Sequence, residues 1–249
     1  MAITVQEINR FQESQKIQGT GTIHHYLSDT NFQHLKNKFS SPRTFKKGSF
    51  LYMEGDHADQ LYYIYSGKVK LKRTMEDGKE ITMALKQKGD LLGEFGFSEE
   101  VHNASSEIIE DCKVAFIHKK EVEALLQNIG MFAVEYMNWL SMTNRQNETK
   151  IRDLLLYGKS GALASTLIRM SNTYGIVDTD GIRLKIKLTN TEIGEFIGLT
   201  RESVNRTLNS WKNEGILSMD NGVIIIKNLC ELKKICGCPS TCPLEICRL

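Results

Sequence analysis

The sequence lacks the segments that would carry it into or across a membrane. Its 249 residues contain no run of about 18 consecutive apolar side chains, which excludes a spanning helix. Residues 1–21 are polar and lack the apolar core of a signal peptide, so we expect the protein to stay in the cytoplasm. The length suits two modest domains joined by a connector.

An excess of charge of one sign is also missing, and so are the usual marks of an enzyme. The formal net charge is +2, so an interaction with nucleic acid must be argued from a motif rather than from bulk charge. The sequence shows no nucleophile–base pair and no phosphate-binding loop, and its six histidines are scattered. We therefore predict that the protein is not an enzyme.

Residues 42–118 have the pattern of short antiparallel strands. Apolar and polar side chains alternate there with a period of two, which predicts strands buried on one face. Glycines separate the alternating segments, as tight turns require. The expected strands contain Val69 and Leu71, then Ile81, Met83 and Leu85, then Val114 and Phe116. This pattern predicts a small β-roll, preceded by a helical arm in which Phe32, Leu35 and Phe39 share one face.

A long helix is expected from about Met131 to Tyr157, a stretch without proline or glycine. Side chains at alternating spacings of four and three residues form a seam along it, which is typical of a helix paired lengthwise with a second copy. The alternative is a helix packed only on its own domain. The expected dimer seam consists of Met137, Leu140, Asn144, Asn147, Ile151 and Leu154, in which the asparagines can fix the register.

Residues 188–217 predict a helix-turn-helix. Thr189 and Glu192 can form a capping box at the start of the first helix, and Gly198 can supply the turn. Thr200 can cap the second helix. That helix would be anchored by an apolar face of Val204, Leu208 and Trp211. The alternative is an amphipathic helix pair that does not bind DNA.

The polar side of the second helix is the candidate DNA-reading surface. A recognition helix presents its first residues to base edges in the major groove, where arginine can donate to guanine and glutamate can accept from cytosine. The candidate DNA-binding residues are Arg201, Glu202, Asn205 and Arg206. Behind them, the Asn221–Gly222 pair predicts a tight hairpin that would form a wing.

The order of β-roll, long helix and winged helix-turn-helix resembles the CRP/FNR transcription regulators over roughly residues 40–228. Residues 55–67 match the β-roll signature of that family, and residues 200–206 match its recognition helix. The resemblance implies an α+β fold with a cNMP-binding-like roll, a dimerisation helix and a C-terminal winged helix-turn-helix. It also implies Arg201, Glu202 and Arg206 as base readers on a palindromic TGTGA-like site. The implied partners are double-stranded DNA, a second copy of the chain as a homodimer, and RNA polymerase.

Five segments follow from this organisation. We expect an N-terminal arm at 1–40, the β-roll at 41–127, the dimerisation helix at 128–158, the winged helix-turn-helix at 159–230 and a cysteine-rich tail at 231–249. The glycines at 158 and 161 interrupt the helical pattern and mark the boundary before the DNA-binding segment.

The β-roll is not expected to bind cAMP. The Gly93–Glu94 pair resembles the pair that holds the ribose in nucleotide-binding members of the family. Those members place an arginine about ten residues later, where this chain has Ala104. Since a buried phosphate without a cationic partner is costly to desolvate, we interpret Glu94 as a structural residue of the roll.

Cysteines are concentrated in the last twenty residues, which contain Cys230, Cys236, Cys238, Cys242 and Cys247. Disulfides are unusual in a reducing compartment, whereas crowded thiolates bind soft metals. Uneven gaps and two Cys-Pro steps favour an iron–sulfur cluster over a structural zinc, and both stay open on composition alone. The lone Cys112 and Cys230 are interpreted as structural or incidental.

A second resemblance narrows the choice of metal. The tail and residues 150–158 are similar to the Bacillus-type Fnr branch of the family, in which three C-terminal cysteines and one aspartate hold an oxygen-labile [4Fe–4S] cluster. The implied ligands are Cys238, Cys242, Cys247 and Asp153, with Cys236 competing for the place of Cys238. Without the resemblance, Asp153 would be read as a solvated helix residue paired with a neighbouring basic residue. A carboxylate is a harder ligand than a thiolate, which would make its iron bond more labile.

The sequence therefore predicts an oxygen-responsive transcription regulator of anaerobic metabolism. An assembled cluster would hold a DNA-competent homodimer, and oxygen would degrade the cluster and release that geometry. The alternatives are a redox-independent regulator with zinc in its tail and a regulator with a small-molecule effector in the β-roll.

Overall fold

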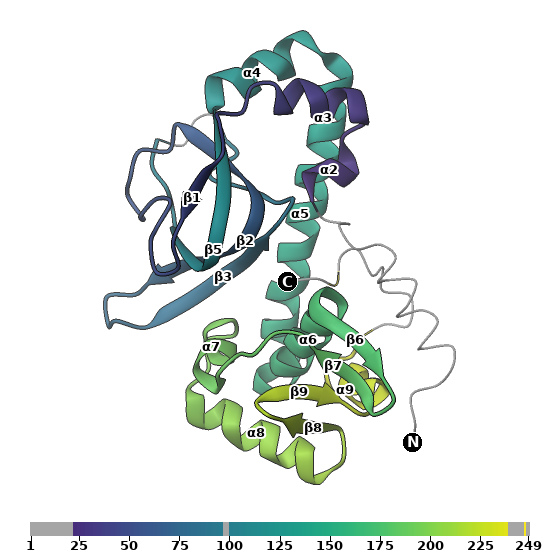
Figure 1. Ribbon diagram of the computed structural model, residues 1–249. Helices are drawn as coiled ribbons and strands as arrows, with labels where there is room; N and C mark the ends of the chain where they lie inside the picture. Colours follow the sequence, from purple (N-terminus) through teal and green to yellow (C-terminus); the bar gives the residue numbers. More distant parts are fainter. Residues whose placement is uncertain (1–21, 97–99, 239–246, 248–249) are drawn as a thin grey trace. The chain divides into compact units, whose positions relative to one another are not determined.

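The computed structural model describes residues 22–96, 100–238 and 247. It confirms the predicted α+β class, with antiparallel sheets, a long helix and a C-terminal helix-turn-helix (Figure 1). The chain divides into two compact units, one with the described residues up to Thr143 and the other with those from Asn144 onward. Each unit has its own hydrophobic core.

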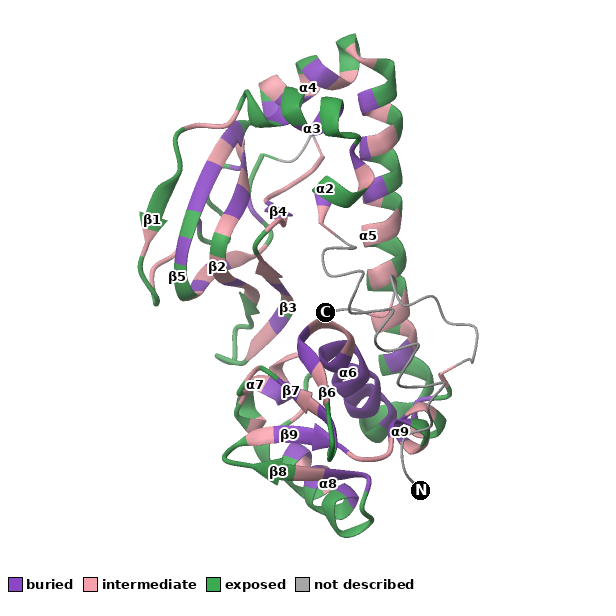
Figure 2. Cartoon of the chain, turned by 45° about the vertical axis from the view of Figure 1, so that its right-hand side comes forward, coloured by how far each residue is buried: buried purple, intermediate pink, exposed green. Residues whose placement is uncertain are grey.

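The first unit is built on an antiparallel sheet. In spatial order its strands are β1 (Arg43–Phe45), β5 (Ser105–His118), β2 (Gln60–Thr74) and β3 (Glu80–Gln87), and β4 (Leu91–Leu92) also pairs with β2. The two long strands, β2 and β5, carry most of the buried positions of the sheet (Figure 2). Val69, Ile108 and Val114 are at most 2% exposed, as alternating strands with one buried face require.

Strand β3 departs from the predicted alternation at Met83. Leu71 pairs with Ala84, but the next residue, Lys72, pairs with Thr82, so Met83 is the extra residue of a β-bulge. A bulge exchanges the inward and outward sides of the strand beyond it. Thr82 is therefore buried while Met83 is 51% exposed, and the prediction that Met83 shares the buried face is wrong.

Helices complete the first unit. They are α2 (Ile23–Tyr26), α3 (Asp29–Lys36), α4 (Lys119–Asn128) and the first half of α5 (Gly130–Leu156). The predicted apolar face of the N-terminal arm is confirmed in α3, where Phe32 and Leu35 are buried. These side chains share one core with Phe132 and Trp139 of α5. The carboxylate of Glu135 adds a polar link by accepting from the α3 side chain of Asn31 at 2.8 Å.

The second unit combines a central helix, a four-stranded sheet and a helix pair. Its elements after α5 are α6 (Gly158–Tyr174), β6 (Gly175–Asp178), β7 (Gly181–Leu184), α7 (Asn190–Glu195), α8 (Arg201–Asn213), β8 (Leu217–Asp220), β9 (Val223–Ile226) and α9 (Leu229–Ile235). The sheet is antiparallel in the order β6-β7-β9-β8. Every residue from Gly161 to Ser171 is buried, so α6 is the centre of this core (Figure 2).

Two boundaries differ from the sequence pattern. The glycines of residues 157–161 predict a break of several residues, but only Tyr157 separates α5 from α6. The break is short because Gly158 adopts a φ of 59°, which glycine tolerates without strain. Apolar side chains alternate from Ile182 to Leu188 in the sequence, which predicts a strand of that length, but strand β7 ends at Leu184. Over the ranges that the structure describes, no helix is long and apolar enough to cross a bilayer.

Candidate functional site

Capping interactions start both helices of the helix-turn-helix. The Thr189 hydroxyl accepts from the Glu192 amide while the Glu192 carboxylate accepts from the Thr189 amide, which confirms the predicted capping box. The hydroxyl of Thr200 accepts from the Ser203 amide at 3.3 Å at the start of α8. Both caps satisfy amides that would otherwise lack partners.

The turn between α7 and α8 depends on two glycines. Gly198 has a φ of 64°, which fits its predicted place in the turn. A Cβ on Gly194 would lie 2.3 Å from the carbonyl oxygen of Leu199, so a larger residue would force the backbone apart. The sequence pattern did not identify Gly194, because the close approach involves a residue beyond the end of its helix.

The second helix, α8, has one buried and one exposed face. Val204, Leu208 and Trp211 are at most 5% exposed and pack into the core of the unit. The four candidate DNA-reading residues are Arg201, Glu202, Asn205 and Arg206, and all of them are exposed. The first two turns of α8 therefore present two guanidinium groups, a carboxylate and an amide to solvent. These groups match the donors and acceptors of base edges.

A hairpin follows α8 at the predicted place. Strands β8 and β9 are joined by Asn221 and Gly222, which have φ values of 49° and 80°. Two residues with positive φ are typical of the type I′ turn that Asn-Gly favours. Asp220 accepts from the Arg183 guanidinium at 2.7 Å, which ties the hairpin to β7.

In the β-roll, Gly93 and Glu94 make contacts within the fold. Gly93 has a φ of 124°, and a Cβ there would lie 2.9 Å from the carbonyl oxygen of Gln60. The Glu94 carboxylate accepts from the amide of Asn103 at 2.9 Å. These contacts give Gly93 and Glu94 a structural role in the roll. The position at which the resemblance would require an arginine is occupied by Ala104.

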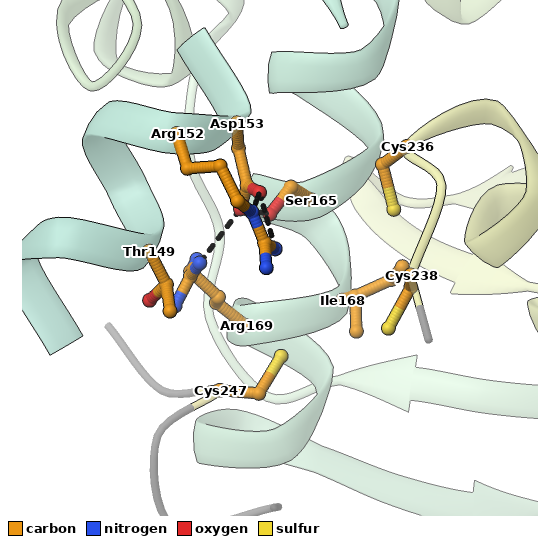
Figure 3. A pocket seen from close by; sticks show the side chains of 9 residues that line it. All are labelled: Thr149, Arg152, Asp153, Ser165, Ile168, Arg169, Cys236, Cys238 and Cys247. Carbon is orange, nitrogen blue, oxygen red and sulfur yellow. Dashed lines mark hydrogen bonds and ion pairs between the residues drawn. The ribbon is translucent and has the colours of Figure 1, made fainter. Parts of the chain in front are cut away.

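A pocket in the second unit brings together a carboxylate and three thiols. Asp153 comes from the last turns of α5, Cys236 and Cys238 from the end of α9, and Cys247 from the tail (Figure 3). The remaining lining residues are Thr149, Arg152, Ser165, Ile168 and Arg169. Among the described residues, no three Asp, Glu, Cys or His side chains meet closely enough to share a single metal ion. Cys242, another expected ligand, lies outside the described residues.

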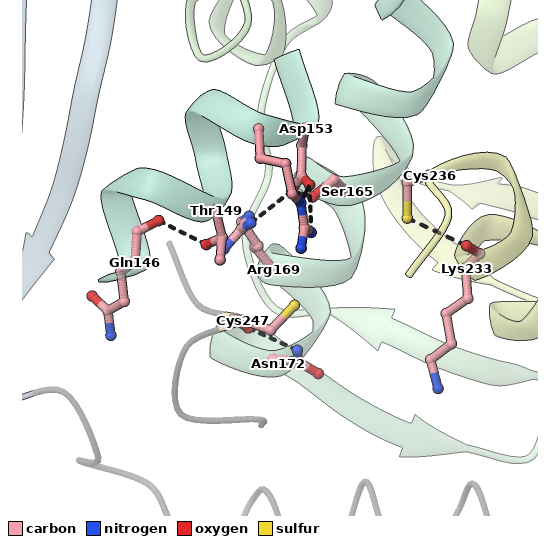
Figure 4. Close-up of polar contacts among 10 residues, drawn as sticks. Gln146, Thr149, Asp153, Ser165, Arg169, Asn172, Lys233, Cys236 and Cys247 are labelled. Carbon is pink, nitrogen blue, oxygen red and sulfur yellow. Dashed lines mark hydrogen bonds and ion pairs between the residues drawn. The ribbon is translucent and has the colours of Figure 1, made fainter. Parts of the chain in front are cut away.

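Asp153 is buried, and both of its carboxylate oxygens are hydrogen-bonded. Oδ1 accepts from the Nε and Nη2 atoms of Arg152 at 3.1 and 2.7 Å. Oδ2 accepts from the Ser165 hydroxyl and, at 2.7 Å, from Nη2 of Arg169 (Figure 4). Ser165 and Arg169 lie on α6, so these bonds fasten the end of α5 to the centre of the core. The pairing with the adjacent Arg152 fits the expectation of a neighbouring basic partner, whereas sequence reasoning missed Ser165 and Arg169.

The end of α9 places the first two thiols. The amide of Cys238 donates to the carbonyl of Lys233 at 2.8 Å, and that of Gly237 donates to Lys234 at 3.1 Å. This is the bonding pattern of a Schellman motif, in which the glycine takes a positive φ, here 55°. The Ile-Cys-Gly-Cys order of the sequence thus ends the helix and turns Cys238 toward the pocket.

The thiols differ in their surroundings. Cys236 is 3% exposed and donates to the Lys233 carbonyl at 3.5 Å. The neighbouring Cys238 thiol lowers the pKa of Cys236 below its ordinary value through a hydrogen bond, although burial and the Asp153 carboxylate oppose the shift. The carbonyl of Cys247 accepts from the Asn172 amide of α6 at 2.7 Å, which fixes this tail residue at the pocket (Figure 4).

Two cysteines lie away from the pocket. Cys112 is buried in the β-roll, where burial raises the pKa of its thiol to about 11. Cys230 is exposed on α9 and is not among the lining residues. Neither thiol is placed to join Asp153.

Replacing Gly237 with alanine should destabilise the second unit more than the same change at Gly215. Both glycines end helices in Schellman motifs with positive φ, so each alanine should cost about 1 kcal/mol of backbone strain. A Cβ at Gly215 meets open space, whereas a Cβ at Gly237 would lie 2.4–2.5 Å from the ring of Tyr157. Urea unfolding of the apo chain measures both losses. Equal losses for the two variants would show that the Tyr157 contact contributes nothing.

Comparisons with known proteins match both units. A model of the cyclic nucleotide-binding domain matches residues 42–129, and a model of the Crp-like helix-turn-helix domain matches residues 161–235. The chain is 40% identical over 226 residues to the anaerobic regulatory protein of Bacillus subtilis (strain 168), covering 90% of this chain and 94% of that protein. It is 28% identical over 181 residues to the cAMP-activated global transcriptional regulator CRP of Salmonella typhimurium, covering 72% and 85% of the two chains.

Solved structures share the fold. The structure of a CooA mutant from Carboxydothermus hydrogenoformans has a TM-score of 0.70 at 23% identity, covering 84% of this chain and 97% of that one. The structure of FixK2 from Bradyrhizobium japonicum has a TM-score of 0.67 at 22% identity, covering 79% and 96%.

Proposed function

The chain belongs to the CRP/FNR family of transcription regulators, and from this membership we propose that it is a cytoplasmic, oxygen-sensing regulator of anaerobic metabolism. In this proposal it binds a palindromic TGTGA-like site as a homodimer when a [4Fe–4S] cluster is assembled, and it acts on transcription through RNA polymerase. The single observation that carries the sensing part is the gathering of Asp153, Cys236, Cys238 and Cys247 around one pocket. The similarity to an anaerobic regulatory protein supports the same assignment.

The pocket residues fit an iron–sulfur cluster by donor chemistry. Thiolates are the usual ligands of such clusters, and each iron of a four-iron cluster takes one protein ligand. Asp153, Cys247 and the adjacent pair of Cys236 and Cys238 lie on different sides of the pocket, as Figure 3 shows, which suits a group with several binding corners. When bound, the cluster would supply a chromophore and an oxygen-labile link between the end of α5 and the tail.

We propose Cys238, Cys242, Cys247 and Asp153 as the ligands. Cys236 remains the competitor for the place of Cys238, but its burial and its bond to the Lys233 carbonyl give it a packing role in the core. Cys238 is half-buried and is turned to the pocket by the Schellman motif, so it is the better placed of the two.

DNA recognition is assigned to the exposed face of α8. Arg201, Glu202, Asn205 and Arg206 stand on the first two turns of a helix whose other face is anchored by Trp211 and its neighbours. Such a helix can enter the major groove with its N-terminal end against the bases. Two copies on a palindrome would read half-sites about one helical turn of DNA apart.

The second copy is proposed to pair along α5. Met137, Ile151 and Leu154 are 66%, 56% and 42% exposed, and Asn144 and Asn147 are exposed between them. Apolar side chains at this spacing on an open helix face are typical of a paired helix. Leu140 is half-buried against the core of the first unit and would lie at the edge of the seam.

Anaerobic purification of the full chain, reconstituted with ferrous iron and sulfide, tests the proposal. We expect a brown protein with about four irons per chain that binds a TGTGA palindrome more tightly than a shuffled duplex. Air should bleach the visible absorbance and weaken DNA binding together. Fluorescence anisotropy at fixed salt measures the affinity.

Other outcomes of this experiment contradict separate parts of the proposal. A colourless protein with stoichiometric zinc would overturn the sensing part and favour a structural zinc in the tail. An affinity that responds to cAMP rather than to air would assign regulation to the β-roll. Equal affinity for the palindrome and the shuffled duplex would overturn the recognition part.

A further inference from the structure

The carboxylate of Asp153 is a proposed cluster ligand, yet other side chains already occupy its acceptor positions with hydrogen bonds. An ionised carboxylate has about four lone-pair sites, and Asp153 receives four hydrogen bonds, two on each oxygen. Asp153 therefore offers no unused acceptor in this conformation. At least one of its partners must leave before it binds iron, and the structure distinguishes which partner that is.

The partners of Oδ2 cannot leave easily. Arg169 is 4% exposed and Ser165 is buried, and both belong to α6 at the centre of the core. A guanidinium keeps its charge at every accessible pH, so separating a buried arginine from its carboxylate is strongly unfavourable. Arg169 and Ser165 are therefore expected to hold Oδ2 whether or not iron is present. Ligating carboxylates are commonly oriented in this way by groups behind them.

The partner of Oδ1 is different. The side chain of Arg152 is 38% exposed, and it lies on α5 next to Asp153 itself. The Arg152 guanidinium is hydrated when it leaves the carboxylate, so losing this pair costs less than losing the buried Arg169 pair. Arg152 does not belong to α6, and when its guanidinium moves toward solvent Oδ1 loses both of its donors and can accept a metal ion.

We propose that Asp153 binds the cluster through Oδ1, that Arg169 and Ser165 are positioning residues that hold Oδ2, and that Arg152 competes with iron for Oδ1. This inference rests on the proposed function and adds a regulatory element to it. Arg152 recaptures the carboxylate when the iron bond breaks, so it favours the cluster-free state. The carboxylate thus alternates between an arginine and iron, while its link to α6 is kept.

Two opposite effects on cluster retention test the proposal. In the reconstituted full chain, Arg152→Gln should raise the EDTA concentration that removes half of the visible absorbance by about two- to fivefold, because a competitor of iron is lost. Ser165→Ala should lower that concentration by about 10- to 100-fold, because an orienting group is lost. A substitution that merely damages the fold cannot produce the gain expected for Arg152→Gln.

Arg145→Gln is the matched control for charge. Arg145 is exposed on the same helix seven residues earlier, and its replacement removes a positive charge without touching Asp153. If Arg145→Gln and Arg152→Gln raise the EDTA concentration equally, the effect is general electrostatics and the competition is overturned. An unchanged or lower value for Arg152→Gln overturns it as well.

The apo protein provides a readout that does not depend on the cluster. The melting temperature of apo Arg152→Gln should lie only a few degrees below that of Arg145→Gln, because a two- to fivefold competition corresponds to about 0.4–1 kcal/mol in the apo state. A fall of more than about 8 °C would show that Arg152 is structural and would overturn the proposal. If the proposed function itself is wrong, the wild-type chain retains no iron. That result is distinct from every outcome that overturns only the competition by Arg152.

Discussion

Cys247→Ser should leave the chain unable to keep its iron–sulfur chromophore, and its anaerobic affinity for a TGTGA palindrome should fall to that of the air-exposed wild type. A serine oxygen is a poor substitute for a soft thiolate ligand, so one corner of the cluster loses its protein bond. We expect the affinity to drop about 5- to 150-fold, the range of typical coupling between two sites. Visible absorbance and anisotropy under nitrogen measure the two losses.

The fold gives reason to expect that Cys247→Ser removes a ligand without unfolding the protein. Asn172 donates to the backbone carbonyl of Cys247, so its contact with the tail does not involve the thiol. Cys230→Ser is the matched control, because it removes an exposed thiol of α9 that does not line the pocket. A brown, DNA-competent Cys247→Ser protein, or an equal loss in Cys230→Ser, would contradict the ligand assignment.

Arg206→Ala should weaken binding to the specific site by about 1–3 kcal/mol and relax the preference at one base position. The guanidinium stands on the exposed face of α8, and the buried Leu208 and Trp211 that anchor the helix are untouched by the change. A bidentate contact from arginine to guanine accounts for an effect of this size. Anisotropy with a set of single-base variants of the palindrome measures both effects.

Lys212→Ala separates base reading from general charge. Lys212 is exposed near the C-terminal end of α8, far from the end that enters the groove. Its loss should weaken binding by a similar factor on every sequence, if at all. Should Arg206→Ala also weaken every duplex equally, Arg206 would be a phosphate contact and the assignment of base reading would be wrong.

The helix-turn-helix could be predicted in detail because its determinants are local. The capping box at Thr189 and Glu192, the cap at Thr200 and the Asn221–Gly222 turn each involve residues within three positions of one another. Caps and turns that involve residues so close in sequence can be predicted from residue types and spacing. The requirement for glycine at residue 194 escaped because it depends on how closely two backbones approach.

The environment of Asp153 could not be predicted in the same way. Its partners Ser165 and Arg169 are 12 and 16 residues away and belong to another helix. Helical periodicity places Asp153 on a face of α5, but it does not say that α6 lies against that face. Only the resemblance to a known branch of the family suggested a role for this carboxylate. Its burial and its two partners on α6 are findings of the structure.

The β-bulge at Met83 shows a different limit. Alternation along a strand predicts which side chains are buried only while the pairing register is continuous. One extra residue between Ala84 and Thr82 exchanges the two faces of the strand. The residue types in this stretch do not indicate that a bulge forms there. Burial of Leu85 agrees with the pattern, and the disagreement begins at the bulge.

The ion pair between Asp153 and Arg169 also has an evolutionary consequence. A neutral residue at 153 would strand a charge in the middle of α6, so a lineage that abandons oxygen sensing would lose stability before it gained anything. We therefore expect the two positions to change together among descendants of a common ancestor. Homologues that lack the aspartate should carry an uncharged side chain in place of the arginine. We expect the two residues to be substituted together rather than one at a time.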